Sequence, residues 1–79
     1  MGLEELDRRA LRQLGANIRA ERGRRGWTQD ELGYQAVLSQ RSISDFENAR
    51  TEGGVTRYMR IARALEVPIE RLFDGVDGL

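Results

Sequence analysis

Residues 39–50, SQRSISDFENAR, are rich in side chains that donate or accept hydrogen bonds. Drawn as a helix, with about 100° between successive residues, the segment has two different sides. Ile43 and Phe46 share one side, with Ser42 and Glu47 beside them, and can enter a core. The other side offers hydrogen-bonding groups to water or to a binding partner, and it consists of Gln40, Arg41, Ser44, Asp45 and Asn48.

Binding, rather than catalysis, is the chemistry that the composition allows. The chain has no histidine, which removes the usual general base and the commonest metal ligand. It has no cysteine, so disulfides and thiolate metal sites are excluded. No close carboxylate pair lies in an apolar context that would raise a pKa. We therefore expect no enzymatic activity, no catalytic or metal-ligating residues, no cofactor and no small-molecule ligand.

The charges are distributed unevenly along the 79 residues, although the net charge is zero. Residues 8–63 contain twelve arginines and six carboxylates, a balance of +6, whereas residues 1–7 and 64–79 are each acidic. Such a chain can still present a positive face to a partner. No apolar run reaches membrane-spanning length, and the N-terminus lacks the hydrophobic region of a signal peptide. We expect one compact, cytoplasmic domain with no membrane contact.

Periodic apolar residues predict a series of helices. A first helix over about 4–24 carries Leu3, Leu6, Ala10, Leu14 and Ile18 at spacings of three and four. TQDE at 28–31 is a capping box that opens a second helix, and Ser39 can cap a third.

The C-terminal half predicts two more helices. Val55 to Leu65 outline a fourth, capped near Thr56, and Pro68 suits the first turn of a fifth that holds Ile69, Leu72 and Phe73. Only residues 37–39 separate the second helix from the third, as a helix-turn-helix requires. The sequence therefore predicts an all-α fold of five helices.

The run WTQDELGYQAVLSQRSISDFENAR resembles the helix-turn-helix of lambdoid phage repressors, Cro and the wider Xre-type transcription regulators. LGANIRAERGRRG resembles the family's first helix and RIARALEVPIERLF its last two, so that the resemblance covers about residues 14–73. It implies a compact five-helix lambda-repressor-like DNA-binding domain over 14–74, with the helix-turn-helix at about 28–48. Residues 1–13 form an N-terminal extension that continues into the first helix, and residues 75–79 form a C-terminal tail.

The resemblance also implies roles for individual residues. Gln40 and Arg41, with Ser44 and Asp45 one turn further along, match residues that meet base edges. Arg can bind guanine, and Gln adenine, through two hydrogen bonds. Asp45 can accept from cytosine or pair with Arg41. Contacts to the DNA backbone are expected from Thr28, Gln29, Asn48, Arg50 and Arg57. Arg22 and Glu47 match a partly buried ion pair between the first and third helices.

Three positions depart from the family pattern. Val37 and Ala49 replace common glycines, and Gly53-Gly54 occupies a loop that often contains proline. Because a β-branched residue adopts a positive φ poorly, we expect the turn at Val37 to be built differently.

These features predict a sequence-specific, double-stranded DNA-binding transcription regulator that acts as a homodimer on a palindromic operator, either a phage-type repressor or a small autoregulating controller. It would act at the nucleoid of a bacterial cell. The alternative is an antitoxin-like module that binds a protein partner and for which DNA binding is secondary. A C-terminal dimer interface is expected at Leu72, Phe73, Val76 and Leu79, with residues 1–7 as the alternative location.

Overall fold

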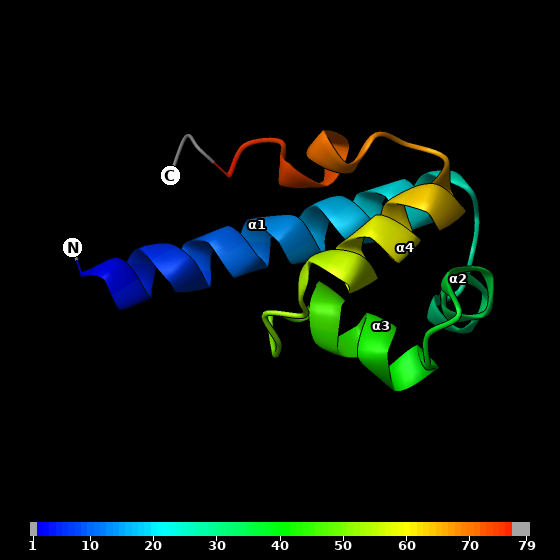
Figure 1. Ribbon diagram of the computed structural model, residues 1–79, viewed down its shortest axis with the longest axis horizontal. Coiled ribbons are helices and arrows are strands. Elements are labelled where there is room, and N and C mark those ends of the chain that lie inside the picture. Colours follow the sequence, from blue (N-terminus) through cyan, green and yellow to red (C-terminus); the bar gives the residue numbers. More distant parts are fainter. Residues whose placement is uncertain (1, 77–79) are drawn as a thin grey trace.

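Helices account for most of the residues that the structure describes. The structure is a computed structural model that describes residues 2–76, apart from the side chain of Leu3. Four α-helices and one short 3-10 helix occupy this range (Figure 1): α1 (Leu3–Arg24), α2 (Gln29–Ala36), α3 (Gln40–Glu47), α4 (Val55–Leu65) and η1 (Ile69–Phe73). The all-α prediction is thus confirmed within these residues.

The predicted fifth α-helix is instead the 3-10 helix η1. Pro68 precedes it in extended conformation, and Gly75 follows it with a φ of 81°. The backbone N–H of Arg71 donates to Pro68, three residues earlier, at 2.9 Å. The tighter three-residue bond suits so short a segment, because five residues cannot develop a regular α-helical ladder.

The molecule measures 37 × 21 × 21 Å, and the long helix α1 supports its other elements. Its C-terminal half packs against α3 and η1, whereas its first turns project beyond α3 and α4 (Figure 1). At the crossing with α3, a Cβ on Gly15 would lie 2.6 Å from the carbonyl oxygen of Phe46 and 2.7 Å from that of Glu47. Only glycine permits this close approach, which fixes the position of α3 on α1.

One hydrophobic core joins all five elements. Its largest fully buried side chains are Ile18, Leu32, Ile43, Ile61, Leu65 and Leu72. The ring of Tyr58 packs edge-on against Phe46, with centroids 5.1 Å apart. Trp27, in the connection between α1 and α2, is half-buried and packs against this core.

The turn between α2 and α3 corrects the prediction made for Val37. Val37 has φ 57° and ψ 48°, so it adopts the left-handed conformation that glycine supplies elsewhere. Its side chain is 79% exposed and meets no compensating packing. The turn therefore keeps the glycine-type geometry at the cost of backbone strain. Ala49, at the end of α3, adopts the same left-handed conformation, with φ 58°.

Side-chain caps begin α2 and α3 but not α4. Thr28 Oγ1 accepts from the backbone N–H of Glu31 at 3.0 Å, and Ser39 Oγ accepts from that of Ser42 at 3.0 Å. The N-cap of α4 is Gly54, with φ 87° and no side-chain cap, so the cap predicted near Thr56 is wrong. No helix within residues 2–76 is long and apolar enough to cross a membrane.

Candidate nucleic-acid interface

Helix α3 presents the polar side that the sequence predicted. Ile43, Phe46 and Glu47 are buried against the rest of the molecule. Gln40, Arg41 and Asn48 are exposed, and Ser44 and Asp45 are half-buried between them. The five candidate residues therefore lie on one accessible surface. The base contacts of Gln40, Arg41, Ser44 and Asp45, and the backbone contact of Asn48, stay predictions.

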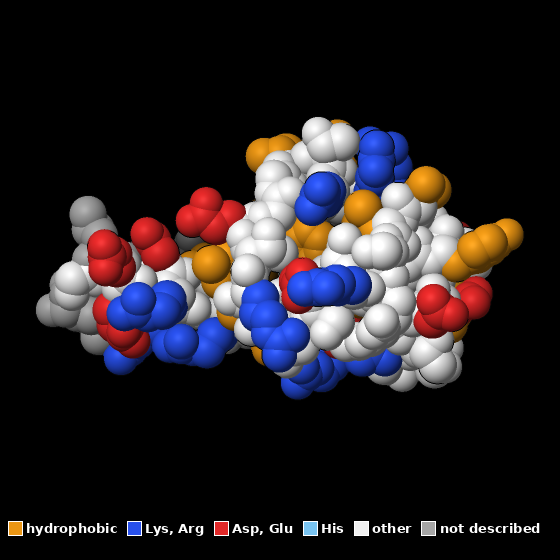
Figure 2. Space-filling view, turned by 90° about the horizontal axis from the view of Figure 1, so that it is seen from below, with side chains coloured by type: hydrophobic (Ala, Val, Ile, Leu, Met, Phe, Trp, Pro, Cys, Tyr) orange, Lys and Arg blue, Asp and Glu red, His pale blue; other side chains and the backbone are white. Residues whose placement is uncertain are grey.

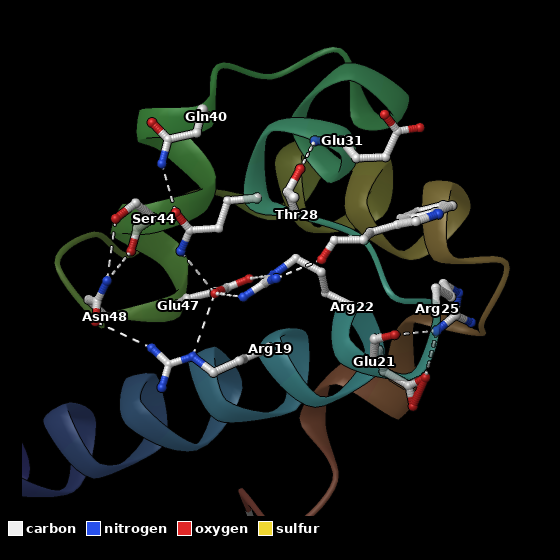
Figure 3. A network of polar contacts seen from close by, with 12 residues as sticks. Arg19, Glu21, Arg22, Arg25, Thr28, Glu31, Gln40, Ser44, Glu47 and Asn48 are labelled. Atoms are coloured by element: carbon white, nitrogen blue, oxygen red, sulfur yellow. Dashed lines mark hydrogen bonds and ion pairs between the residues drawn. The ribbon is translucent and has the colours of Figure 1, made fainter.

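Glu47 is the centre of a polar network behind that surface (Figure 3). Its side chain is fully buried, and it accepts two hydrogen bonds from the Arg22 guanidinium, at 2.7 Å from Nε and 3.0 Å from Nη2. Arg22 also donates through Nη1 to the carbonyl oxygen of Trp27 at 2.7 Å. The two-pronged pair ties α1 to α3, as the resemblance implied.

The Glu47 carboxylate stays ionised although it is buried. Burial by itself raises its pKa, but hydrogen bonds from Arg22 and Gln29, with the charges of Arg22 and Arg19, outweigh that effect. The pKa of Glu47 therefore lies below its ordinary value. The hydrogen bond to Glu47, acting against burial, correspondingly raises the pKa of Arg22.

Gln29 connects this network to the first residue of α3. Its amide nitrogen donates to Glu47 Oε1 at 3.0 Å, and its amide oxygen accepts from Gln40 Nε2 at 2.7 Å. Gln40 is thus held by a chain of hydrogen bonds that begins at a buried carboxylate (Figure 3). A side chain held in one orientation loses less conformational entropy when it binds a partner.

Asp45 pairs with a different arginine from the one considered in the sequence. Its Oδ1 lies 3.8 Å from Nη1 of Arg50, and its carbonyl oxygen accepts from the Arg50 backbone N–H at 2.8 Å. Among the described contacts, Asp45 is thus bound to Arg50 and not to Arg41. The left-handed Ala49 turns the chain back, which brings Arg50 beside the end of α3.

The remaining candidates lie at the edges of the α3 surface. Thr28 caps α2, whose N-terminal N–H groups are suited to a phosphate. The Asn48 amide donates to the carbonyl oxygen of Ser44 at 2.8 Å, which is a helix-end role. Arg50 and Arg57 are exposed before and within α4. Figure 2 shows basic side chains spread over this face, with acidic ones gathered mainly toward its two ends.

The predicted dimer residues do not share one environment. Leu72 is completely buried in the core, so it is not available to a partner, and that assignment is corrected. Phe73 is 40% exposed and packs against the ring of Tyr58. Val76 is half-buried. Leu79 lies outside the described residues.

Arg19 is a network residue that the sequence interpretation missed. Its Nε lies 3.6 Å from Glu47 Oε1, and its Nη2 donates to Asn48 Oδ1 at 3.4 Å. The sequence feature that could have identified Arg19 is its position three residues before Arg22, because residues at this spacing lie on the same face of a helix.

Helix α3 is polar and exposed, follows α2 after a tight turn, and is held by the hydrogen bonds of Glu47. These features define the class of protein as a helix-turn-helix domain of the lambda-repressor type. A family model described as "Helix-turn-helix domain" matches residues 13–72. The chain belongs to this family of DNA-binding regulators, and its resemblance to the lambdoid and Xre-type group is confirmed.

Curated relatives include the antitoxin HipB of Escherichia coli. The proteins of strains K12 and CFT073 are each 34% identical over 55 residues, which is 70% of this chain. The match covers 62% and 58% of these two relatives, so the chain spans about three fifths of their length.

Solved structures show the same fold. A hypothetical transcription factor, NHTF, from Neisseria has 30% identity and a TM-score of 0.78, covering 81% of this chain and 74% of that one. The P22 c2 repressor, in complex with the synthetic operator 9T, has 29% identity and a TM-score of 0.73, covering 78% and 94%. The restriction-modification controller C.AhdI from Aeromonas hydrophila has a TM-score of 0.78 at 22% identity, covering 80% and 96%, which supports the fold alone.

Proposed function

We propose that this protein is a sequence-specific regulator of transcription that binds double-stranded DNA as a homodimer at a palindromic operator. Helix α3 lies in the major groove, with Gln40, Arg41, Ser44 and Asp45 facing base edges. The observation that carries this proposal is the hydrogen-bonded chain from Glu47 through Gln29 to Gln40, which orients an exposed side chain at the start of α3. The P22 c2 repressor bound to a synthetic operator has the same fold.

Contacts to phosphates set the register of α3 on the duplex. Thr28 and Gln29 begin α2, whose N-terminus is suited to an anion. Arg50, oriented by Asp45, and Arg57 are exposed cations on the flank, with Asn48 between them and α3. A second copy then reads the other half-site, about one DNA turn away. The regulator is a phage-type repressor or a small autoregulating controller at a bacterial nucleoid.

Selection of bound sequences from a random DNA pool tests this proposal. We expect an enriched inverted repeat at moderate salt. Arg41→Ala should weaken binding to that site by about 1–3 kcal/mol and relax preference at one guanine per half-site. Arg50→Ala should instead weaken binding to all sequences and reduce the salt slope by about one. Uniform loss across sequences in both variants would contradict the placement of α3.

A second candidate function is that of an antitoxin-like module with a protein partner, for which the 34% identity to HipB is the specific observation. Tyr34 and Val37, each 79% exposed, offer apolar surface to such a partner. A pool selection without any enriched motif, together with a stoichiometric complex with a toxin encoded beside this chain, would favour this function over the first.

A further inference from the structure

Three arginines on α1 lie on one face of the helix. Arg8, Arg12 and Arg19 are spaced by four and seven residues, so their side chains project in nearly the same direction. Their side chains are 60%, 58% and 55% exposed. At 1.5 Å per residue, the row is about 16 Å long. The three arginines form a basic row on the longest element of the molecule.

This arginine row leads directly to the end of α3. Gly15, between Arg12 and Arg19 in the sequence, is the point where α1 touches the backbone of Phe46 and Glu47. Arg12 and Arg19 consequently flank the crossing of the two helices, and they line one hollow together with Ala16, Glu47 and Asn48. Figure 3 shows Arg19 directed from α1 toward Glu47 and Asn48.

The positive charge of this hollow is only partly neutralised. Glu47 is engaged by the two-pronged bond from Arg22, and its distance to Arg19 is longer, 3.6 Å. Arg12 lies 3.6 Å from Glu5, but the same carboxylate also pairs with Arg8 at 3.1 Å and with Arg9 at 3.7 Å. Arg12 therefore shares its one carboxylate partner with two other guanidinium groups, and its guanidinium keeps hydrogen-bond donors that an anion can accept from.

We propose that Arg12 and Arg19 form a phosphate-binding site on α1 that contacts the DNA backbone beyond the base pairs facing α3. This inference rests on the proposed function, because the duplex reaches Arg12 and Arg19 only if it is bound by α3, whose C-terminal end lies beside them. Guanidinium groups bind phosphate oxygens through paired hydrogen bonds without reading sequence. The site on α1 thereby lengthens the stretch of DNA backbone that the protein contacts.

Glu5 restrains this site. Its carboxylate competes with phosphate for Arg8, Arg9 and Arg12, all of which it contacts within the same two turns of α1. Removing its charge should therefore strengthen DNA binding. Glu4 is exposed, and no ion pair of the described residues includes it, so it provides a control with the same change of charge.

The test measures the affinity of the full chain for its selected operator and for a scrambled duplex over a series of KCl concentrations. Arg12→Ala should lower the salt slope by about 0.9 and weaken both duplexes equally, by about eight-fold at roughly 0.1 M salt. The double variant Arg12→Ala/Arg19→Ala should lower the salt slope by about twice as much. Arg12→Lys should retain most of the wild-type salt slope. Glu5→Gln should increase the affinity for both duplexes more than Glu4→Gln does.

Arg63→Ala is the matched control, because Arg63 is an exposed arginine that lines a different hollow, beside Val37 and Glu66. If Arg12→Ala and the double variant behave like Arg63→Ala while the wild type still selects an operator, the phosphate site is wrong and the proposed function stands. If the wild type selects no sequence at all, the proposed function fails first. Equal effects of Glu5→Gln and Glu4→Gln would remove the role given to Glu5.

Discussion

Individual side chains in this protein are coupled through Glu47, which binds Arg22 from α1 and Gln29 from α2. A charge left in this place without its partner is costly, since water cannot solvate it there. Arg22→Met and Glu47→Leu should each lower the free energy of unfolding by about 3 kcal/mol, and the double variant should recover part of that loss. Urea unfolding of the four proteins gives the coupling energy.

The exposed pair of Arg8 with Glu5, 3.1 Å apart, is the control for this cycle. Both partners are accessible to water, so their coupling energy should be below about 1 kcal/mol. A similarly small value for Arg22 and Glu47 would contradict the interpretation that their contact carries the network.

Acid should weaken the fold through the same residue. The pKa of Glu47 is lowered by Arg22 and Gln29 in spite of burial, and that of Glu21 by Arg25 and Arg24 in spite of burial. The unfolded chain binds protons first, so this stabilisation is present above about pH 4.5 and is lost as the pH falls through the folded-state pKa values. Thermal unfolding between neutral and acidic pH should show this loss, and Glu47→Gln should flatten the profile. Parallel profiles of the two proteins would exclude Glu47 as a source.

At the scale of elements, the connection from α2 to α3 is strained. Val37 holds φ 57° and ψ 48°, which costs a non-glycine residue about 1–2 kcal/mol. Val37→Gly should therefore raise the free energy of unfolding, by about 1 kcal/mol after the greater freedom of glycine in the unfolded chain is subtracted. Chemical denaturation measures the change.

Gln35, exposed within α2, provides the opposite case to Val37. Gln35→Gly should destabilise the protein by about 1 kcal/mol, because there glycine replaces a residue in ordinary helical conformation. The same sign of change at both positions would contradict the strain assigned to the turn.

At the scale of the whole molecule, the proposed dimer is expected to form through the C-terminal segment. Phe73 and Val76 remain partly accessible beside α1, whereas Leu72 belongs to the core. Sedimentation at micromolar concentration should show a dimer for the full chain and a monomer for a version that ends at Asp74. The carbonyl oxygens of Leu72 and Asp74 both accept from Asn17 at 2.8 Å, so the shortened version keeps this anchor.

A version without residues 1–7 should remain a dimer. Loss of the dimer only in that version would move the interface to the N-terminal extension. A full-length monomer that binds one asymmetric half-site would contradict the dimer itself.

Local sequence patterns determined most of the elements. Apolar residues at spacings of three and four predicted α1, and the apolar sides of residues 39–50 and 55–65 predicted α3 and α4, because each such stripe must be buried. Thr28 and Ser39 predicted the starts of α2 and α3, because a cap satisfies backbone groups only a few residues away. The polar side of α3 followed from the same periodicity. All of these depend on interactions between residues close together in the chain.

The tertiary structure decided what depends on partners far apart in the sequence or on the path of the chain between helices. Leu72 proved to be core and not surface, since α1 and α4 close over it. Asp45 contacts Arg50 and not Arg41, because the turn at Ala49 brings Arg50 back to α3. Val37 adopts a left-handed conformation that its own preference opposes, because the packing of α2 and α3 fixes the path between them. At Val37 the sum of distant contacts outweighs a local preference of about 1–2 kcal/mol.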